Sequence, residues 1–202
     1  TYPLISQYLS GTTASGLYEA KLAREEFSGE VHVFAPAFKD ADLEELLKIT
    51  DHIVFNSERQ LRKHGPRCRD AGISVGLRIN PQCSTQGDHA LYDPCAPGSR
   101  FGVTLDRIPS DLLDLVDGLH FHTLCEQGAD DLQTTLKAVE EQFGSYLHEV
   151  KWLNMGGGHH ITREGYDVDL LISEIKRIQE TYNLEVYIEP GEAIALNAGY
   201  LA

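Results

Sequence analysis

The chain has 202 residues, of which 42% are hydrophobic and 24% charged, the composition of an ordinary globular domain that can bury a sizeable core. It carries 31 acidic against 17 basic residues, a formal net charge of -14, which argues against nucleic acid or an anionic membrane as partner and suits a small cationic substrate such as an amine. The same acidity is also typical of a surface that is merely kept soluble by charge. No apolar run approaches the ~18 residues of a membrane span. Four cysteines without a CxxC pair predict reduced thiols and a cytoplasmic location.

Short apolar strands and amphipathic helices alternate along the chain, after a first helix predicted over residues 2–9. The predicted strands cover residues 11–14, 31–35, 52–56, 74–80, 118–124, 151–154 and 185–189. The predicted helices cover residues 17–26, 40–50, 57–71, 109–116, 130–146 and 166–182, and Ser57 is expected to cap its helix. Such alternation predicts a parallel sheet with helices outside it. One irregular stretch, residues 81–99, is long enough to suggest a functional loop.

Polar side chains gather toward the C-terminal ends of the predicted strands. Arg78, His120, His122 and Glu189 each alternate with apolar neighbours near the end of a strand. Ligands bind at this edge both in β/α barrels and in open doubly wound sheets, so the pattern alone does not separate the two folds. About seven strands are predicted where a closed barrel has eight. We therefore expect one domain over residues 1–202, which as a barrel would lack a strand before residue 2.

Three consecutive glycines, Gly156, Gly157 and Gly158, follow the predicted strand at 151–154. Glycines after a strand let backbone N–H groups approach an anion closely, and barrels commonly bind phosphate after their last strands. A flexible turn that needs positive φ angles would explain the same residues. The spacing is not that of a P-loop or of GxGxxG, so nucleotide binding is not indicated.

Two histidine pairs, His120 with His122 and His159 with His160, suggest a metal site at first. Zinc takes three or four convergent ligands, and no cysteine or carboxylate stands at a suitable spacing to complete either pair. The sequence therefore predicts no metal. His122, at the end of its strand, is better suited to lie over a planar ring, whereas His120 is expected to be a hydrogen-bonded core histidine.

The last predicted strand ends in a carboxylate, Glu189, followed by Pro190 and Gly191. A carboxylate at the centre of such a site is costly unless a proton or a cation pairs with it. A protonated pyridine nitrogen would be such a cation, and a structural salt bridge is the alternative.

These motifs together resemble the fold-type III pyridoxal-phosphate (PLP) enzymes, which include ornithine, diaminopimelate and arginine decarboxylases. The finer resemblance, which covers essentially the whole chain, is to the carboxynorspermidine (carboxyspermidine) decarboxylase family. It rests on TASGLYEA at 13–20, YDPCAPGSRFG at 92–102, LHFHTLCE at 119–126, MGGGHHIT at 155–162 and IEPGEA at 188–193. The resemblance implies an alanine racemase-like (β/α)8 TIM-type barrel followed by a C-terminal β-domain that residues 1–202 do not include.

The resemblance also implies roles for individual residues. His122 would stack on the pyridine ring and Glu189 would bind its nitrogen, while Gly156 to Gly158 would hold the phosphate. Arg78 and Cys125 are further candidates at the cofactor. Arg100, Asp93 and Glu126 are candidates on the substrate side, within or after the loop that contains Tyr92.

Two departures from the family pattern stand out. Glu192 occupies the position where related decarboxylases place an arginine that helps to hold the phosphate, so phosphate binding would depend more on backbone amides. Cys125 stands where a serine is common. The family's Schiff-base lysine would precede residue 1, because the internal lysines read as exposed helix residues.

The implied activity is PLP-dependent decarboxylation of carboxynorspermidine or carboxyspermidine in polyamine biosynthesis, by a homodimer that shares its active sites. Residues 1–202 alone are expected to be inactive. Two alternatives stay open: another decarboxylase of the group, acting on diaminopimelate or arginine, and a non-catalytic homologue that binds a protein partner.

Overall fold

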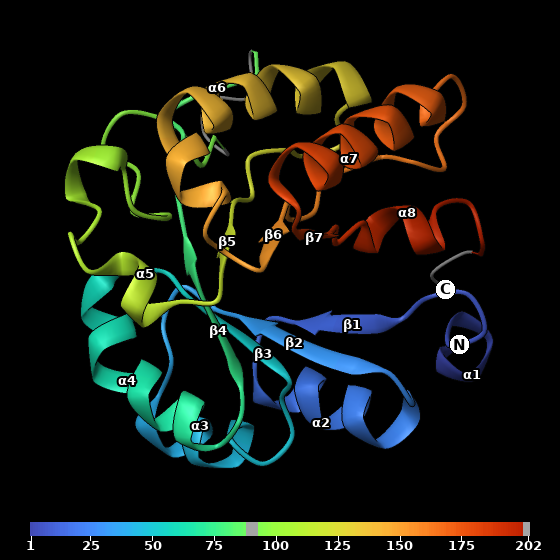
Figure 1. The fold of residues 1–202 in the computed structure, drawn as a ribbon. Coiled ribbons are helices and arrows are strands. Elements are labelled where there is room, and N and C mark those ends of the chain that lie inside the picture. Colours follow the sequence, from blue (N-terminus) through green and yellow to red (C-terminus); the bar gives the residue numbers. More distant parts are fainter. Residues whose placement is uncertain (88–92, 200–202) are drawn as a thin grey trace. The chain divides into compact units, whose positions relative to one another are not determined.

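The computed structural model, drawn in Figure 1, describes residues 1–87 and 93–199. It contains two compact units, which are described in turn. The first comprises residues 1–78 and 108–118, and the second comprises residues 79–107 and 119–202 apart from the residues outside the description. Within the described part of the chain, no helix is long and apolar enough to cross a membrane.

The first unit is a parallel sheet of four strands in sequence order, each linked to the next by a helix. Its strands are β1 (Gly11–Ala14), β2 (Glu30–Phe34), β3 (His52–Phe55) and β4 (Ser74–Arg78). Its helices are α1 (Tyr2–Ile5), α2 (Leu17–Glu26), α3 (Asp40–Leu46), α4 (Glu58–Asp70) and α5 (Leu112–Leu115). The Ser57 hydroxyl caps α4 by accepting from the Gln60 amide, as predicted.

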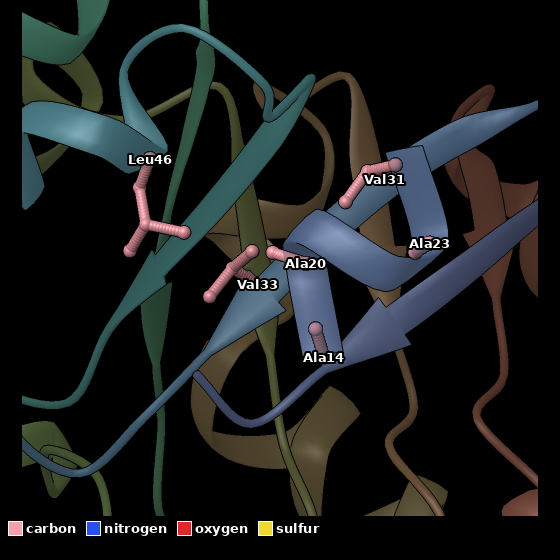
Figure 2. Close-up of a cluster of buried hydrophobic side chains, with 6 residues drawn as sticks. All are labelled: Ala14, Ala20, Ala23, Val31, Val33 and Leu46. Atoms are coloured by element: carbon pink, nitrogen blue, oxygen red, sulfur yellow. The ribbon is translucent and has the colours of Figure 1, made fainter. Parts of the chain in front are cut away.

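Small and branched apolar side chains join α2 and α3 to the strands of this unit. Figure 2 shows the buried cluster, which consists of Ala14, Ala20, Ala23, Val31, Val33 and Leu46. Two alanines one turn apart on α2 let the helix lie close to the sheet. Because Val31 and Val33 of β2 face these helices, Glu30 and His32, which alternate with them, lie on the other face of the sheet.

The second unit contains the three remaining strands, again in sequence order. They are β5 (Gly118–His120), β6 (Trp152–Asn154) and β7 (Glu185–Tyr187), of which β6 and β7 are parallel. The helical elements are η2 (Leu105–Arg107), α6 (Ala129–Leu147), α7 (Val168–Tyr182) and α8 (Gly191–Ala195). Arg177 of α7 makes two hydrogen bonds of 2.8 and 2.7 Å to the Glu140 carboxylate of α6, which holds the two helices together.

The predicted alternation of strands and helices is confirmed, and the main differences are at element ends. Strands β5 and β7 end two residues before His122 and Glu189, respectively, so both functional candidates lie just beyond a strand. The backbone there leaves the regular ladder but stays paired, because Phe121 N–H donates to Asn154 and Glu189 N–H donates to Gly156. The first helix covers only Tyr2–Ile5, and the helix predicted at 40–50 ends at Leu46.

Candidate active site

The three glycines form a tight loop after β6 that packs directly on the backbone following β5. Gly156 and Gly158 have φ angles of 68° and 80°, which L side chains rarely adopt. A Cβ atom at Gly158 would lie 2.1 Å from the Leu124 carbonyl oxygen, and one at Gly156 would lie 2.4 Å from the Phe121 carbonyl oxygen. Both conformation and close approach therefore require glycine, which explains the run more fully than a flexible turn would.

Two of the loop's amides already have acceptors. Gly156 N–H donates to the Asn154 side-chain oxygen at 2.8 Å, and Gly157 N–H donates to His122 Nδ1 at a longer 3.3 Å. That the three glycines hold a phosphate stays a prediction. Of the two amides that already donate, that of Gly156 makes the shorter hydrogen bond and is the less available for a phosphate.

The Glu189 carboxylate lies just beyond β7 and is mostly buried. Its side chain is 12% exposed, and the Asn154 amide donates to its Oε1 at 2.8 Å. His120 Nε2 lies 3.8 Å from Oε2. Burial alone would raise the pKa of Glu189, but the facing His120, the Asn154 amide and His122 lower it below the ordinary value. The site thus keeps a buried carboxylate anionic, which makes it a ready partner for a cation.

Two histidines flank this carboxylate. His120 is fully buried in β5, and His122 is half-buried just after it, with ring centroids 6.5 Å apart and planes tilted by 49°. His122 is therefore the more accessible of the two, as expected of a ring that covers a ligand. The Asn154 side chain joins the groups, because it bonds both Glu189 and the glycine loop.

Ligand atoms of His120, His122 and Glu189 all lie within 4.8 Å of one another. The expectation that no carboxylate completes the histidine pair was therefore wrong, because the fold brings Glu189, 67 positions after His122, close to both histidines. His159 and His160 are not part of this group: both are buried, and His159 Nε2 lies 3.3 Å from the Met155 carbonyl oxygen. The prediction of no metal itself stays a prediction.

Gln127 is a supporting residue that the sequence did not single out. Its side-chain oxygen accepts from Thr85, from Gln86 and from the Cys125 amide, at 3.1, 2.7 and 3.3 Å. Its backbone N–H donates to the Gly158 carbonyl at 3.0 Å. One residue thus ties the loop around residue 85 to the segment after β5 and to the glycine loop. A lone glutamine after a strand gives no sequence signal of this kind.

The remaining predicted site residues are less closely connected to this cluster. Cys125 and Glu126 are exposed, and Glu126 has a φ angle of 53° with its carbonyl accepting from Arg163. Asp93 is half-buried and its carboxylate accepts from the Cys95 amide at 2.8 Å, which is a local turn contact. Arg100 is exposed. Their roles stay predictions, and Tyr92 lies outside the described residues.

Arg78, which ends β4, and Asn56, which directly follows β3, belong to the first unit. Both are buried, and the Arg78 guanidinium lies 4.9 Å from the centre of the Phe34 ring. This cation–π contact holds Arg78 at the C-terminal end of β4, where the sequence placed it.

None of the seven lysines, all of which the structure describes, lies at the C-terminal end of a strand. Lys21, Lys48, Lys63, Lys137 and Lys176 are on helices or at a helix end, Lys39 precedes α3, and Lys151 precedes β6. The expectation that these lysines are surface residues is confirmed for all but Lys21, which is half-buried.

Known decarboxylases match the chain over nearly its whole length, although no family model matches it. The chain is 42% identical over 198 residues to carboxynorspermidine/carboxyspermidine decarboxylase of Campylobacter jejuni, with 98% of this chain and 51% of the relative covered. It is 41% identical over 202 residues to carboxyaminopropylagmatine decarboxylase of Synechocystis sp., with 99% and 52% covered. The crystal structure of carboxynorspermidine decarboxylase from Campylobacter jejuni, complexed with norspermidine, matches with a TM-score of 0.86 at 41% identity, covering 96% of this chain and 49% of that one. The chain spans about half the length of the curated relatives it matches.

Proposed function

We propose that this chain belongs to the fold-type III family of decarboxylases and takes part in the PLP-dependent decarboxylation of carboxynorspermidine or carboxyspermidine in polyamine biosynthesis. The buried anion Glu189 is the observation that carries the proposal. A carboxylate at 12% exposure whose pKa is lowered by its neighbours stays anionic, and a protonated pyridine nitrogen is a cation that such an anion can bind.

The residues around Glu189 fit such a cofactor. PLP supplies an electron-withdrawing ring that accepts the electrons released when CO₂ leaves. Glu189 would keep the ring nitrogen protonated, and Asn154 would hold Glu189 in place through its 2.8 Å hydrogen bond. His122, half-buried and two residues beyond the buried His120, would cover one face of the ring and exclude water from it.

The phosphate would lie against the glycine loop. Since the Gly156 amide is committed to Asn154, we place this contact on the amides of Gly157 and Gly158. The 3.3 Å bond from Gly157 to His122 is long for a hydrogen bond, so this amide can be redirected at low cost. Glu192, which stands where an arginine is usual in the family, adds no positive charge here, so backbone dipoles would carry the contact.

The acidic chain suits a substrate with several ammonium groups. Arg100, Asp93, Glu126 and Cys125 remain candidates around the substrate and cofactor, and Arg78 remains a candidate beneath the ring. The near-equal identity to a carboxyaminopropylagmatine decarboxylase favours that carboxylated polyamine as the competing substrate. A homodimer in the cytoplasm is also part of the proposal. The four cysteines, which are all free, support the reducing compartment.

The substrate proposal is tested by measuring CO₂ release by the intact protein from four substrates at equal concentration: carboxynorspermidine, carboxyspermidine, carboxyaminopropylagmatine and meso-diaminopimelate. We expect the highest kcat/KM with one of the first two. Preference for carboxyaminopropylagmatine or diaminopimelate would move the assignment to another decarboxylase of the family. Binding of PLP without release of CO₂ from any substrate would favour a non-catalytic homologue. An isolated chain of residues 1–202 is expected not to turn over.

A further inference from the structure

A second cluster of histidines and a carboxylate belongs to the first unit. It consists of Glu30 and His32 on β2 and His52, the first residue of β3. His32 Nε2 lies 2.9 Å from Glu30 Oε2, and the rings of His32 and His52 are stacked with centroids 4.0 Å apart and planes 4° from parallel.

The sheet itself brings these three side chains together. Glu30 and His32 are two residues apart on one strand and therefore share a face. His32 and His52 are directly paired in the register of β2 and β3, so their side chains leave neighbouring strands side by side. A carboxylate and a histidine at i and i+2, with a second histidine opposite on the next strand, present three ligands from one rigid surface.

The surroundings of the cluster favour a cation. Glu30, Asp51 and Asp117 act electrostatically on His52, and each makes the positive state of its ring more favourable. His32 is 9% exposed and Glu30 45% exposed by side chain, which leaves the cluster open to solvent on the side of the carboxylate.

We propose that Glu30, His32 and His52 form a binding site for a divalent transition-metal ion such as Zn²⁺. Two imidazoles and one carboxylate are a donor set that borderline metals accept, with water completing the coordination at the open side. The ligand atoms now lie within 4.8 Å of one another, whereas tetrahedral zinc holds them about 3.4 Å apart. The required movement is thus on the order of 1 Å, and it includes a rotation of the His52 ring, because two stacked rings cannot both direct a lone pair at one ion.

Such a site would join β2 to β3 at their N-terminal ends, away from the strand ends that carry Arg78 and Asn56. Its role is therefore to stabilise the first unit, because an ion bound only by the folded state raises the free energy of unfolding in proportion to the logarithm of its concentration. This role does not depend on the decarboxylase proposal.

Calorimetric titration of Zn²⁺ into the intact, chelator-treated protein tests the site. The wild type is expected to bind Zn²⁺, and His52→Gln is expected to lose at least tenfold in affinity, since even outer-shell changes at metal sites cost 10 to 100-fold. His122→Gln is the matched control, because it removes a ligand atom from the second histidine–carboxylate cluster and should leave the first site unchanged.

Thermal unfolding with and without Zn²⁺ provides a second reading. The midpoint should rise with Zn²⁺ in the wild type and in His122→Gln, and should not rise in His52→Gln. Where His52→Gln is too unstable to purify, Glu30→Gln replaces it, since this side chain is partly exposed. No binding by the wild type, binding unchanged in His52→Gln or Glu30→Gln, or binding lost only in His122→Gln would overturn the proposal.

Discussion

Two clusters of the same composition, two histidines and one glutamate, stand at opposite ends of strands in the two units. The first, Glu30 with His32 and His52, lies at the starts of β2 and β3, and its carboxylate is 45% exposed. The second, His120 and His122 with Glu189, lies in and just beyond the ends of β5 and β7, and its carboxylate is 12% exposed. Identical residue types are thus placed in surroundings of different burial.

The two carboxylates also differ in the neighbouring residues that hold them. Glu189 is fixed by the Asn154 amide, and the loop beside it is fixed by Gln127. Glu30 has His32 as its hydrogen-bond partner and faces solvent. In our two proposals, the buried carboxylate would bind a cationic ligand, whereas the exposed one would exchange its partner for an ion from solution.

The largest expected effect is on catalysis. Glu189→Gln keeps the shape of the side chain but removes its charge, and we expect kcat for carboxynorspermidine to fall about 10² to 10³-fold, as when a preorganised electrostatic partner is removed. Glu185→Gln is the control: this exposed residue starts β7 and accepts from the Tyr187 hydroxyl, and its replacement should leave kcat unchanged. Equal activity of Glu189→Gln and wild type would remove the distinction between the two clusters.

The next effect is on stability. Gly158→Ala introduces a Cβ 2.1 Å from the Leu124 oxygen at a φ of 80°, so backbone strain and overpacking should together lower the free energy of unfolding by about 3 kcal/mol. Gly165→Ala has nearly the same φ, 79°, with open space around it, and should cost about 1 kcal/mol. Urea unfolding of both variants measures the difference. Similar losses in the two variants would show that the Leu124 carbonyl oxygen does not exclude a Cβ atom at Gly158.

As the pH is lowered, the two clusters should lose their contributions to the free energy of unfolding in different pH ranges. The folded state lowers the pKa of His52 from 6.5 to about 4, so the unfolded chain binds more protons in this range and stability falls as pH decreases from 6.5 to 4. The pKa of Glu189 is also lowered, so its contribution is complete above pH 4.5 and is lost as pH falls below that value.

Unfolding free energies measured across this pH range therefore report on each cluster in turn. His52→Gln should flatten the slope between pH 6.5 and 4, and Glu189→Gln should change it below pH 4.5. An unchanged slope between pH 6.5 and 4 in His52→Gln, with or without a flatter slope in Glu189→Gln, would contradict the assignment of this pH range to the buried His52.

The smallest effect concerns the support of the second cluster. Gln127→Ala removes the acceptor of Thr85, Gln86 and the Cys125 amide, and should cost about 1 to 2 kcal/mol in unfolding free energy. Gln7→Ala removes one exposed bond to the Pro3 carbonyl and should stay within about 0.5 kcal/mol. Equal losses of unfolding free energy in the two variants would mean that the hydrogen bonds of Gln127 add little to stability.

The alternation of strands and helices and the polar strand ends could be predicted from the sequence, because both follow from short-range periodicity. Alternation places His120 and His122 on one strand, and Glu189 ends another, without any knowledge of the fold. The pairing of His32 with His52 was not found, because it depends on the register between two strands, which periodicity within each strand does not set.

The same limit explains the error over a third metal ligand and the omission of Gln127. Both depend on segments far apart in sequence that close on one another: Glu189 meets the histidines after β5, and Gln127 meets residues 85 and 158. The glycine run shows the opposite case. A need for positive φ was one of two explanations that the sequence allowed, whereas the carbonyl groups that exclude a Cβ became visible only in the packed structure.

The central claim is that Glu189 is the anion that holds a protonated ring nitrogen. Its most direct test is the binding affinity of the intact wild-type protein and of Glu189→Gln for PLP and for the analogue in which carbon replaces the ring nitrogen. We predict that the wild type binds PLP more tightly than the analogue, and that Glu189→Gln binds both alike. The same preference for PLP in both proteins, or no preference in the wild type, would contradict the claim.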